Sequence, residues 1–341
     1  MAVAPQPRVF EIVALPQVRA RALGTLFDEE IRHWRKELYW DYAPSVEMIR
    51  RHVEARSLSG YVALQRGEVA GYCFFVYEDD KGLLGDVYVL EAYRRERPYG
   101  GPAGIASLLI ERALETLQES PTVRRIEVQV LPFGLEPLAP LFQAHDFRCF
   151  PRLFFYKPLE PQRASETPAA AEAASGVELR PWEDRFFEPL AELIVAAYAG
   201  HLDSQINDHY ETVEGALRFL KNIVLFPGCG VFQPQCSFVA VPAGPAGEPL
   251  APPLAGLAGA VLASQVARGV GHITQLCLRR EWQGRGVGRQ LMQAAMERLA
   301  ARGHHGVSLT VTADNHPAVK LYRRLGFAVL KGFAAYARDL R

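Results

Sequence analysis

The chain has 341 residues, of which 49% are hydrophobic and 22% charged, as in a globular protein large enough for two domains. Its 38 basic and 38 acidic residues cancel, which excludes a general electrostatic attraction to nucleic acid or to an anionic membrane. No apolar stretch approaches the about 18 residues of a membrane-spanning helix, and residues 1–8 lack a signal-peptide pattern. The five cysteines suit reduced thiols and show no metal-site spacing, so we expect a cytoplasmic protein without a metal.

The first half of the chain predicts a series of strands and one long helix. Strands are predicted at residues 60–64, 69–77, 83–90, 125–130 and 152–157, and a helix at residues 107–118. Residues 160–176 are rich in Ala, Pro, Ser and Glu without an apolar period, which is typical of a flexible linker. We therefore expect a first domain over residues 8–160, a linker over 161–176 and a second domain over 177–341.

The second half repeats this layout. It predicts strands at residues 177–181, 237–241, 255–265, 271–278 and 306–311, and helices at 186–199, 213–224, 289–302 and 315–327, with a proline-rich loop at 242–253. A glycine-rich turn from Gln283 to Gly288 joins one strand to the next helix. Such a turn lets a backbone approach a phosphate at the start of a helix. Leu291 stands where a Rossmann turn has its third glycine, so the turn is either a phosphate seat or an ordinary tight turn.

Residues 315–327 predict a short capped helix. Asn315 is a good N-cap, Pro317 suits the first turn, and Gly326 suits the left-handed position at the end. Tyr322 lies on the apolar face, where it is either a core tyrosine or a functional one.

The two elements together resemble the GNAT superfamily of N-acetyltransferases. The acetyl-CoA motif of that family, Gln/Arg-x-x-Gly-x-Gly/Ala, is matched by Gln283, Gly286 and Gly288. The later motif, Asn-x-x-Ala-x-x-Leu-Tyr-x-x-x-Gly-Phe, is matched at every fixed position by Asn315, Ala318, Leu321, Tyr322, Gly326 and Phe327. The resemblance covers about residues 177–341.

The resemblance implies an α/β fold of two tandem domains, each a twisted, mixed, mostly antiparallel sheet flanked by helices. It implies acetyl-CoA as the co-substrate, with the pantetheine arm between two strands that separate. The residues implied in binding it are Leu276, Cys277, Leu278, Gln283, Gly284, Arg285, Gly286, Val287, Gly288, Arg289, Asn315 and Ala318. For Arg285 and Arg289, a solvated turn is the alternative.

The implied reaction is direct transfer of acetyl from acetyl-CoA to a primary amine. By resemblance, Tyr322 would protonate the departing thiolate, and a backbone N–H near Leu276 would polarise the carbonyl. His272 occupies the position where the family often has a glutamate, so it is a candidate base, with a packed strand histidine as the alternative.

Residues 200–211 correspond to the segment that lines the acceptor site in the family. Asp203 and Asp208 are candidates to hold a cationic amine, with Glu211 nearby, and His201 and His209 are rival bases. The alternative is a polar helix-capping loop. We expect a small-molecule or peptide amine as the acceptor, and a monomer or homodimer.

The first domain aligns with the second as a degenerate copy. Leu135 stands at the position of Asn315, Phe142 at that of Tyr322 and Asp146 at that of Gly326. Without the tyrosine hydroxyl, we expect a structural role or a role in shaping the substrate site, and binding of CoA stays open. Alternatives for the whole chain are a non-catalytic acyl-CoA-binding or regulatory protein, a mycothiol-synthase-like tandem enzyme, or an acyl-CoA decarboxylase.

Overall fold

The computed structural model describes residues 9–95, 104–135, 137–160, 176–225, 229–243 and 256–340. The chain forms two compact units: unit 1 consists of Met1–Leu38, Tyr42–Arg152 and Phe333–Arg341, and unit 2 of Tyr39–Asp41 and Leu153–Gly332. Residues 161–175 of the expected linker and residues 244–253 of the expected proline-rich loop lie outside the described residues.

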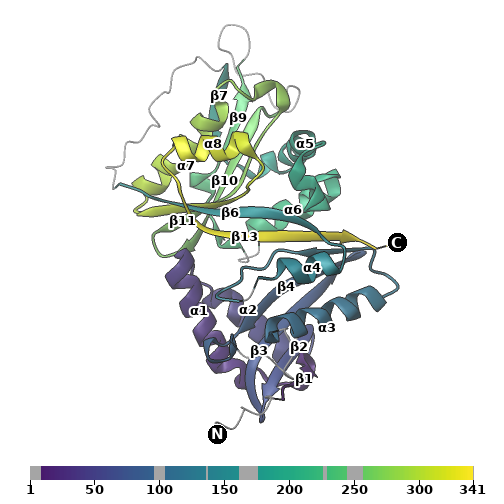
Figure 1. The fold of residues 1–341 in the computed structure, drawn as a ribbon. Helices are drawn as coiled ribbons and strands as arrows, with labels where there is room; N and C mark the ends of the chain where they lie inside the picture. Colours follow the sequence, from purple (N-terminus) through teal and green to yellow (C-terminus); the bar gives the residue numbers. More distant parts are fainter. Residues whose placement is uncertain are drawn as a thin grey trace. The chain divides into compact units, whose positions relative to one another are not determined.

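Unit 1 is a sheet with helices packed on it (Figure 1). Its strands follow the order β1-β2-β3-β4-β5-β13. The elements are β1 Glu11–Ala14, α1 Gly24–Leu38, α2 Ala43–Glu54, β2 Ser59–Gln65, β3 Glu68–Glu78, β4 Lys81–Val89, α3 Ile105–Glu119, β5 Arg125–Val128, α4 Ala139–Ala144, and the ends of β6 Arg148–Pro158 and β13 Ala328–Asp339. Helix α3 buries Leu109, Ile110 and Leu117 with other side chains at helical spacing, each contributing about 1.5–3 kcal/mol to stability.

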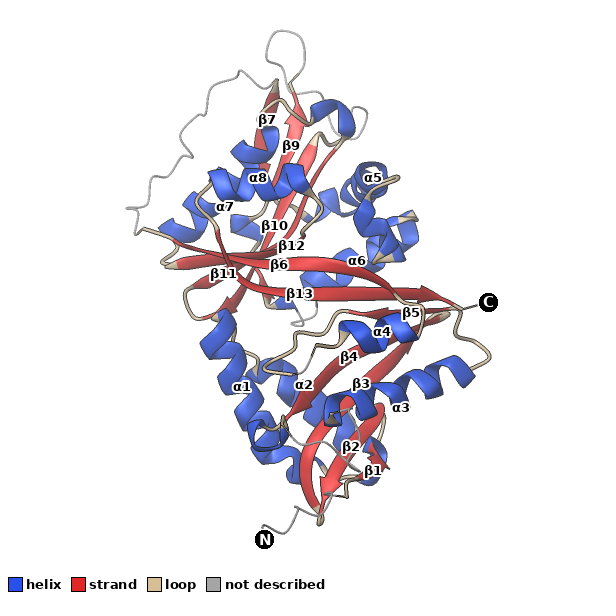
Figure 2. Cartoon of the chain, in the orientation of Figure 1, coloured by secondary structure: helices blue, strands red, loops and turns tan. Residues whose placement is uncertain are grey.

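Unit 2 has the same kind of sheet, in the order β6-β12-β11-β10-β9-β7 (Figure 2), and β8 pairs with β10. Its elements are β7 Val177–Pro181, α5 Phe187–Tyr198, α6 Val213–Leu225, β8 Val231–Phe232, β9 Phe238–Pro242, β10 Gly259–Ala267, β11 Val270–Leu278, α7 Val287–Ala301, β12 Gly306–Thr312 and α8 His316–Arg324. On β10, Val261 packs in one core with α7 and α8, whereas Leu262 packs in another with α5 and α6. Successive side chains point to opposite faces of a strand, so helices cover both faces of this sheet.

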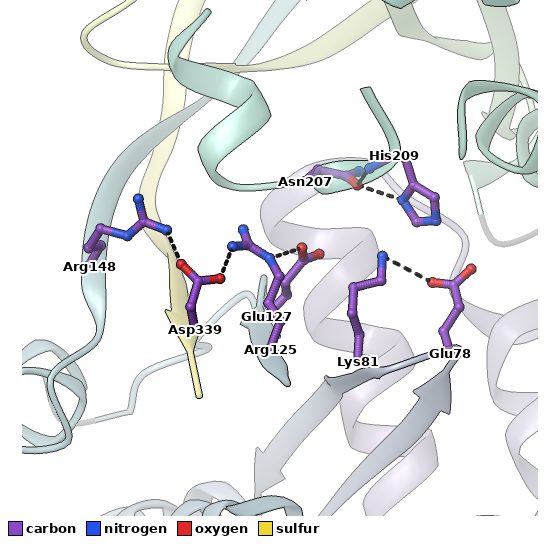
Figure 3. Close-up of polar contacts among 8 residues, drawn as sticks. All are labelled: Glu78, Lys81, Arg125, Glu127, Arg148, Asn207, His209 and Asp339. Atoms are coloured by element: carbon purple, nitrogen blue, oxygen red, sulfur yellow. Dashed lines mark hydrogen bonds and ion pairs between the residues drawn. The ribbon is translucent and has the colours of Figure 1, made fainter. Parts of the chain in front are cut away.

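Each unit is completed by a strand from a distant part of the sequence. In unit 1, Tyr336–Asp339 of β13 pair antiparallel with Arg125–Val128 of β5. Figure 3 shows the ion pairs of this region: Asp339 accepts from Arg125 at 2.6 Å and from Arg148 at 3.0 Å, and Arg125 reaches Glu127 at 2.7 Å. Strand β6 continues into unit 2 from Leu153 onward.

The unit boundaries therefore differ from those expected at residues 160 and 177. The sequence pattern predicts the strand at 152–157, but a period of two residues does not identify the neighbour of a strand. Among the described residues, no helix has both the length and the apolar character needed to span a bilayer.

Candidate functional site

The glycine-rich turn of unit 2 is a solvent-exposed start of a helix. Gly284 and Gly286 have φ of 74° and 83°, the left-handed region that favours glycine. Gly286 is the N-cap of the 15-residue helix α7, and its carbonyl accepts from the N–H of Gln290 at 3.1 Å. Residues 283–286 are exposed, and a Cβ on either glycine would meet no atom within 4 Å. The first N–H groups of α7 thus begin at an open surface and can receive an anion.

Side chains around this turn hold its geometry and supply positive charge. Gln283 Nε2 donates to the carbonyl of Leu278 at 3.3 Å, which ties the turn to the end of β11. The Arg285 guanidinium lies 5.1 Å from the centre of the Trp282 ring, and Arg289 is exposed. Gly288 is buried, and a Cβ there would lie 3.0 Å from the Leu278 side chain, so a glycine lets α7 approach β11.

Strand β11 separates from β12 beside this turn. The parallel pairing runs from Val270 with Gly306 to Ile273 with Leu309, although both strands continue further. Thr274 is an extra residue relative to β10, because Leu262 pairs with Gln275 and Ala263 with Ile273. After this bulge Leu276 and Leu278 are half-buried and Cys277 is buried. A bulge where two strands part is a common feature beside active sites.

Helix α8 presents Tyr322 next to this separation. The Asn315 side chain accepts from the N–H of Ala318 at 3.3 Å, the N-cap bond that the sequence predicts. Tyr322 is 7% exposed and lies among the rings of Phe155 and Phe327. Burial and the negative charge of Asp203 raise the pKa of Tyr322, so its hydroxyl keeps its proton at neutral pH.

The structure brings two of the predicted acceptor residues to this tyrosine. The hydroxyl of Thr312, the last residue of β12, donates to Asp203. The Asp203 N–H donates to His201 Nδ1 at 3.1 Å, and His201 Nε2 lies 3.3 Å from the amide nitrogen of Asn315. The two ring nitrogens of His201 thus each face an N–H donor, one from the backbone of Asp203 and one from the side-chain amide of Asn315, which holds the ring in place.

The remaining acceptor candidates lie further along the same loop. Asp208 opens a separate 3₁₀ turn, Asp208–Tyr210. His209 is buried, and its Nδ1 lies 2.5 Å from the side-chain oxygen of Asn207, as Figure 3 shows. His209 is thus anchored locally, as the capping-loop interpretation predicts.

His272 is a packed strand histidine in its geometry. It is 8% exposed, its Nδ1 lies 2.9 Å from Ser308 Oγ, and its ring contacts those of Trp40 and Phe154 at 5.0 and 5.9 Å. Burial lowers its pKa to about 3. It lies in the paired part of β11, before the bulge. These contacts favour the packed interpretation over the role of a base.

Sequence reasoning missed two side chains of this region, Gln275 and Tyr198. Gln275 Nε2 donates to the Tyr198 hydroxyl at 3.0 Å, and Tyr198 stacks on Tyr210 with ring centres 4.1 Å apart. The signal for Gln275 was an amide inside an apolar strand. Tyr198 had no such signal, because the helix periodicity places it with the core residues.

The aligned copy in unit 1 keeps the local shape without the hydroxyl. Phe147 N–H donates to the Phe142 carbonyl at 3.0 Å, as Phe327 N–H donates to that of Tyr322 at 3.0 Å. Asp146 has a φ of 58°, the left-handed conformation of its counterpart Gly326. Phe142 is fully buried and stacks on Tyr336 at 4.1 Å. This position of unit 1 therefore serves packing.

These features define the class of protein. The model of the acetyltransferase (GNAT) family matches residues 23–147 and again residues 217–327, which together make up more than half of the chain. The chain therefore belongs to the acetyltransferase (GNAT) family and carries its domain in tandem, which confirms the prediction from the two motifs.

Individual relatives are similar over shorter stretches. A 69-residue stretch is 38% identical to the mycothiol acetyltransferase of Corynebacterium aurimucosum, covering 20% of this chain and 23% of the relative. A 58-residue stretch is 45% identical to that of an Arthrobacter species, covering 17% of this chain and 18% of the relative. These matches thus span about a fifth of the length of the relatives.

Solved structures share the fold over nearly the whole chain. A GCN5-related N-acetyltransferase from Sphaerobacter thermophilus has a TM-score of 0.64 at 21% identity, covering 97% of this chain and 96% of its own. A tandem GNAT protein from the clavulanic acid biosynthesis pathway has a TM-score of 0.53 at 16% identity, with 97% and 98% covered. These similarities confirm the fold class predicted from the sequence.

Proposed function

We propose that the chain transfers an acetyl group from acetyl-CoA to a primary amine, and that unit 2 carries the reaction. The observation that carries this proposal is that the exposed N-terminus of α7, the end of β11 that no longer pairs with β12, and the buried Tyr322 all belong to one unit. A phosphate seat, a gap for an extended arm and a proton donor are the parts that a thioester reaction requires.

In this proposal the turn holds the pyrophosphate and β11 holds the pantetheine arm. Backbone N–H groups from Gly284 to Gly288 bind the phosphates, with charge from Arg285 and Arg289. Backbone groups from Leu276 to Leu278 pair with the arm, because β12 no longer pairs with this part of β11. Asn315 and Ala318 keep α8 in place through the cap bond.

Asp203 is proposed to hold the acceptor. Its carboxylate attracts the ammonium form, and Thr312 fixes the orientation of that carboxylate. An alkylamine has a pKa of about 10.4, so forming the neutral nucleophile at pH 7 costs about 4–5 kcal/mol. The neutral nitrogen attacks the thioester carbonyl, and a backbone N–H near Leu276 stabilises the oxyanion.

Collapse of the tetrahedral intermediate breaks the carbon–sulfur bond. The ammonium group releases its first proton to solvent before the attack. The nitrogen then loses its second proton to Asp203, directly or through water, and Tyr322 donates its hydroxyl proton to the departing thiolate. Transfer of the proton from Asp203 back to Tyr322 through water restores both side chains. The products are the acetylated amine and CoA. Asp208 would extend the acidic rim of the acceptor site.

A panel of amines tests this proposal, with the release of CoA measured by a thiol reagent. The panel includes a polyamine, an aminoglycoside, an amino acid and a peptide. It also includes an acceptor of the kind used by mycothiol acetyltransferases, because a stretch of this chain is similar to one of them. We expect saturable CoA release with at least one amine. Binding of acetyl-CoA with no release across the panel would instead support an acyl-CoA-binding protein.

A further inference from the structure

A buried polar side chain stands at the point where β11 parts from β12. The parallel pairing of the two strands ends at Ile273, Thr274 is the extra residue of the bulge, and Gln275 is the next residue. Gln275 is only 4% exposed, and its Nε2 donates to the Tyr198 hydroxyl at 3.0 Å. A buried amide rarely lacks hydrogen-bond partners, so this bond is a specific feature of the strand position.

Unit 1 has a hydrogen bond of the opposite direction at the same strand position. The pairing of β4 with β5 ends at Leu84, Gly85 is the extra residue relative to β3, and Asp86 follows. Asp86 thus occupies the position of Gln275, and it accepts the hydroxyl hydrogen of Tyr42 at 2.9 Å. The amide nitrogen of Gln275 can only donate. A tyrosine hydrogen is therefore bound by this strand position in unit 1, whereas in unit 2 the amide leaves the tyrosine hydrogen available.

The hydroxyl hydrogen of Tyr198 has no acceptor in the part of the chain that the structure describes. Within that part, the one hydrogen bond of the hydroxyl is the bond that its oxygen accepts from Gln275. The side chain is half-buried. Burial raises the pKa of Tyr198, and the negative charge of Asp203 contributes to the shift, so the phenol keeps its proton at neutral pH. Such a phenol can donate its hydrogen to a ligand.

Tyr198 belongs to the acceptor region of unit 2. It is the last residue of α5 and precedes the loop with the acceptor candidates. Its ring lies edge-on to that of His201, with ring centres 5.2 Å apart, and His201 accepts from the backbone N–H of Asp203. The carboxylate of Asp203 influences both Tyr198 and Tyr322. Because this carboxylate repels anions, a neutral oxygen suits the Tyr198 hydroxyl better than an anionic one.

We propose that Tyr198, held by Gln275, determines acceptor specificity by donating a hydrogen bond to a neutral oxygen of the amine substrate. The acceptor is then a primary amine that also carries a hydroxyl or amide oxygen, and its ammonium group lies at Asp203. This specificity rests on the proposed acetyl transfer in unit 2 and adds the class of amine to it. No covalent bond changes at Tyr198, because its role is to bind the substrate.

Two amines that differ by one hydroxyl group test this specificity. The probes are cis-2-aminocyclohexanol and cyclohexylamine, each measured at pH 8 as a competitor of the best acceptor of the amine panel, whose acetylated product is followed by mass spectrometry. In the wild type we expect the inhibition constant of the amino alcohol to be at least about tenfold lower, because a site with an unpaired donor discriminates against an analogue that lacks the oxygen. Equal inhibition constants overturn the proposal.

Two substitutions assign the preference to this hydroxyl. Tyr198→Phe removes the donor and keeps the ring, and Gln275→Glu supplies a carboxylate that accepts the hydrogen, as Asp86 does for Tyr42. We expect each substitution to reduce the preference to less than about threefold. The control is Tyr336→Phe, which removes the same atom in unit 1 and should keep the preference of the wild type. Thermal unfolding checks that the variants are folded, and either folded variant is sufficient.

The outcomes distinguish this specificity from the proposed function. If the preference for the amino alcohol persists in a folded variant, another group binds the oxygen and the role assigned to Tyr198 is wrong, while acetyl transfer stands. If acetyl-CoA binds and no amine of the panel releases CoA, the proposed function fails and the acceptor specificity fails with it.

Discussion

Asp203 interacts with three parts of unit 2. Its carboxylate accepts a hydrogen bond from the Thr312 hydroxyl at the end of β12, and its backbone N–H donates to His201. Burial raises the pKa of Tyr322, and the charge of Asp203 raises it further. Burial raises the pKa of Tyr198, and the same carboxylate adds to this shift. Two phenols that keep their protons therefore lie near one carboxylate. A carboxylate can attract an ammonium substrate, and a protonated phenol can give its proton to a thiolate product.

Tyr322→Phe removes the proposed acid and little else. The ring keeps its packing against Phe155 and Phe327. Because a positioned acid typically contributes about 10²–10⁴-fold, we expect kcat to fall by about that factor with the KM for acetyl-CoA nearly unchanged. Steady-state release of CoA measures both constants.

Tyr336→Phe is the matched control for this variant. Tyr336 is a buried tyrosine of unit 1 that stacks on Phe142, the residue aligned with Tyr322. Its variant loses the same atom without touching the proposed site, so turnover should stay at the wild-type level. Equal turnover in Tyr322→Phe and wild type would remove the acid role.

His272 makes stability depend on pH. Its pKa of about 3 in the folded protein lies below the ordinary 6.5. The neutral, buried ring therefore contributes fully to the stability of the folded protein above pH 6.5, and this contribution is lost as the pH falls from 6.5 toward 3. Between pH 7 and pH 5 this amounts to about 2 kcal/mol of unfolding free energy. We expect His272→Gln to lose this part of the acid sensitivity, measured by denaturant unfolding at both pH values.

The exposed His52 of α2 provides the comparison. His52→Gln makes the same substitution on an exposed helix face, and we expect it to change the free energy of unfolding at pH 7 by less than about 0.5 kcal/mol. The activity of His272→Gln is a second readout, because a packed histidine predicts turnover within a few fold of wild type at pH 8. A loss of about 100-fold or more would support the base role after all.

At the scale of elements, the start of α7 shows what local sequence can predict. Gly284 and Gly286 were identified from the spacing alone, and both have the positive φ that such a turn needs. Asn315 was identified as a cap, and its side chain makes the cap bond. Both features involve residues a few positions apart, so the sequence contains the whole signal.

Contacts between distant residues could not be predicted in this way. Thr312 binds Asp203 across 109 positions, and Gln275 binds Tyr198 across 77. Locally, each of these side chains is an ordinary residue of a strand, a loop or a helix. Their meeting depends on how β11, β12 and α5 pack, which periodicity does not describe.

Gly286→Ala tests the phosphate seat. A Cβ there meets no atom within 4 Å, so the direct cost is the backbone strain at φ 83°, about 1–2 kcal/mol. The methyl group would lie on the open surface where the phosphates of acetyl-CoA are proposed to bind, so we expect the KM for acetyl-CoA to rise about tenfold or more with kcat less affected.

Gly303→Ala separates strain from binding. Gly303 follows the other end of α7, has the same φ of 83°, and likewise meets no atom within 4 Å. Its variant should lose similar stability in thermal unfolding and keep the wild-type KM. If both variants raise the KM equally, the turn at Gly286 has no special part in binding.

At the scale of the whole molecule, the two copies share a fold and differ in their polar residues. Unit 2 has Tyr322 and Gln275 where unit 1 has Phe142 and Asp86. Strands β11 and β4 each have a bulge and each continue past the end of their parallel pairing. Without the tyrosine, unit 1 lacks the proposed proton donor but keeps the same backbone features.

The exchange of strands predicts that the copies are not separable at residue 160. A chain of residues 1–160 lacks Tyr336–Asp339, so β5 loses its antiparallel partner and Phe142 loses the ring on which it stacks. Removing a large buried aromatic contact costs about 3–5 kcal/mol, a large part of the stability of a domain. We expect this piece to lack cooperative thermal unfolding.

A synthetic peptide of residues 328–341 should restore cooperative unfolding, whereas the same peptide with Tyr336→Ala and Asp339→Ala should not. Cooperative unfolding of residues 1–160 alone would show that β13 is dispensable to unit 1.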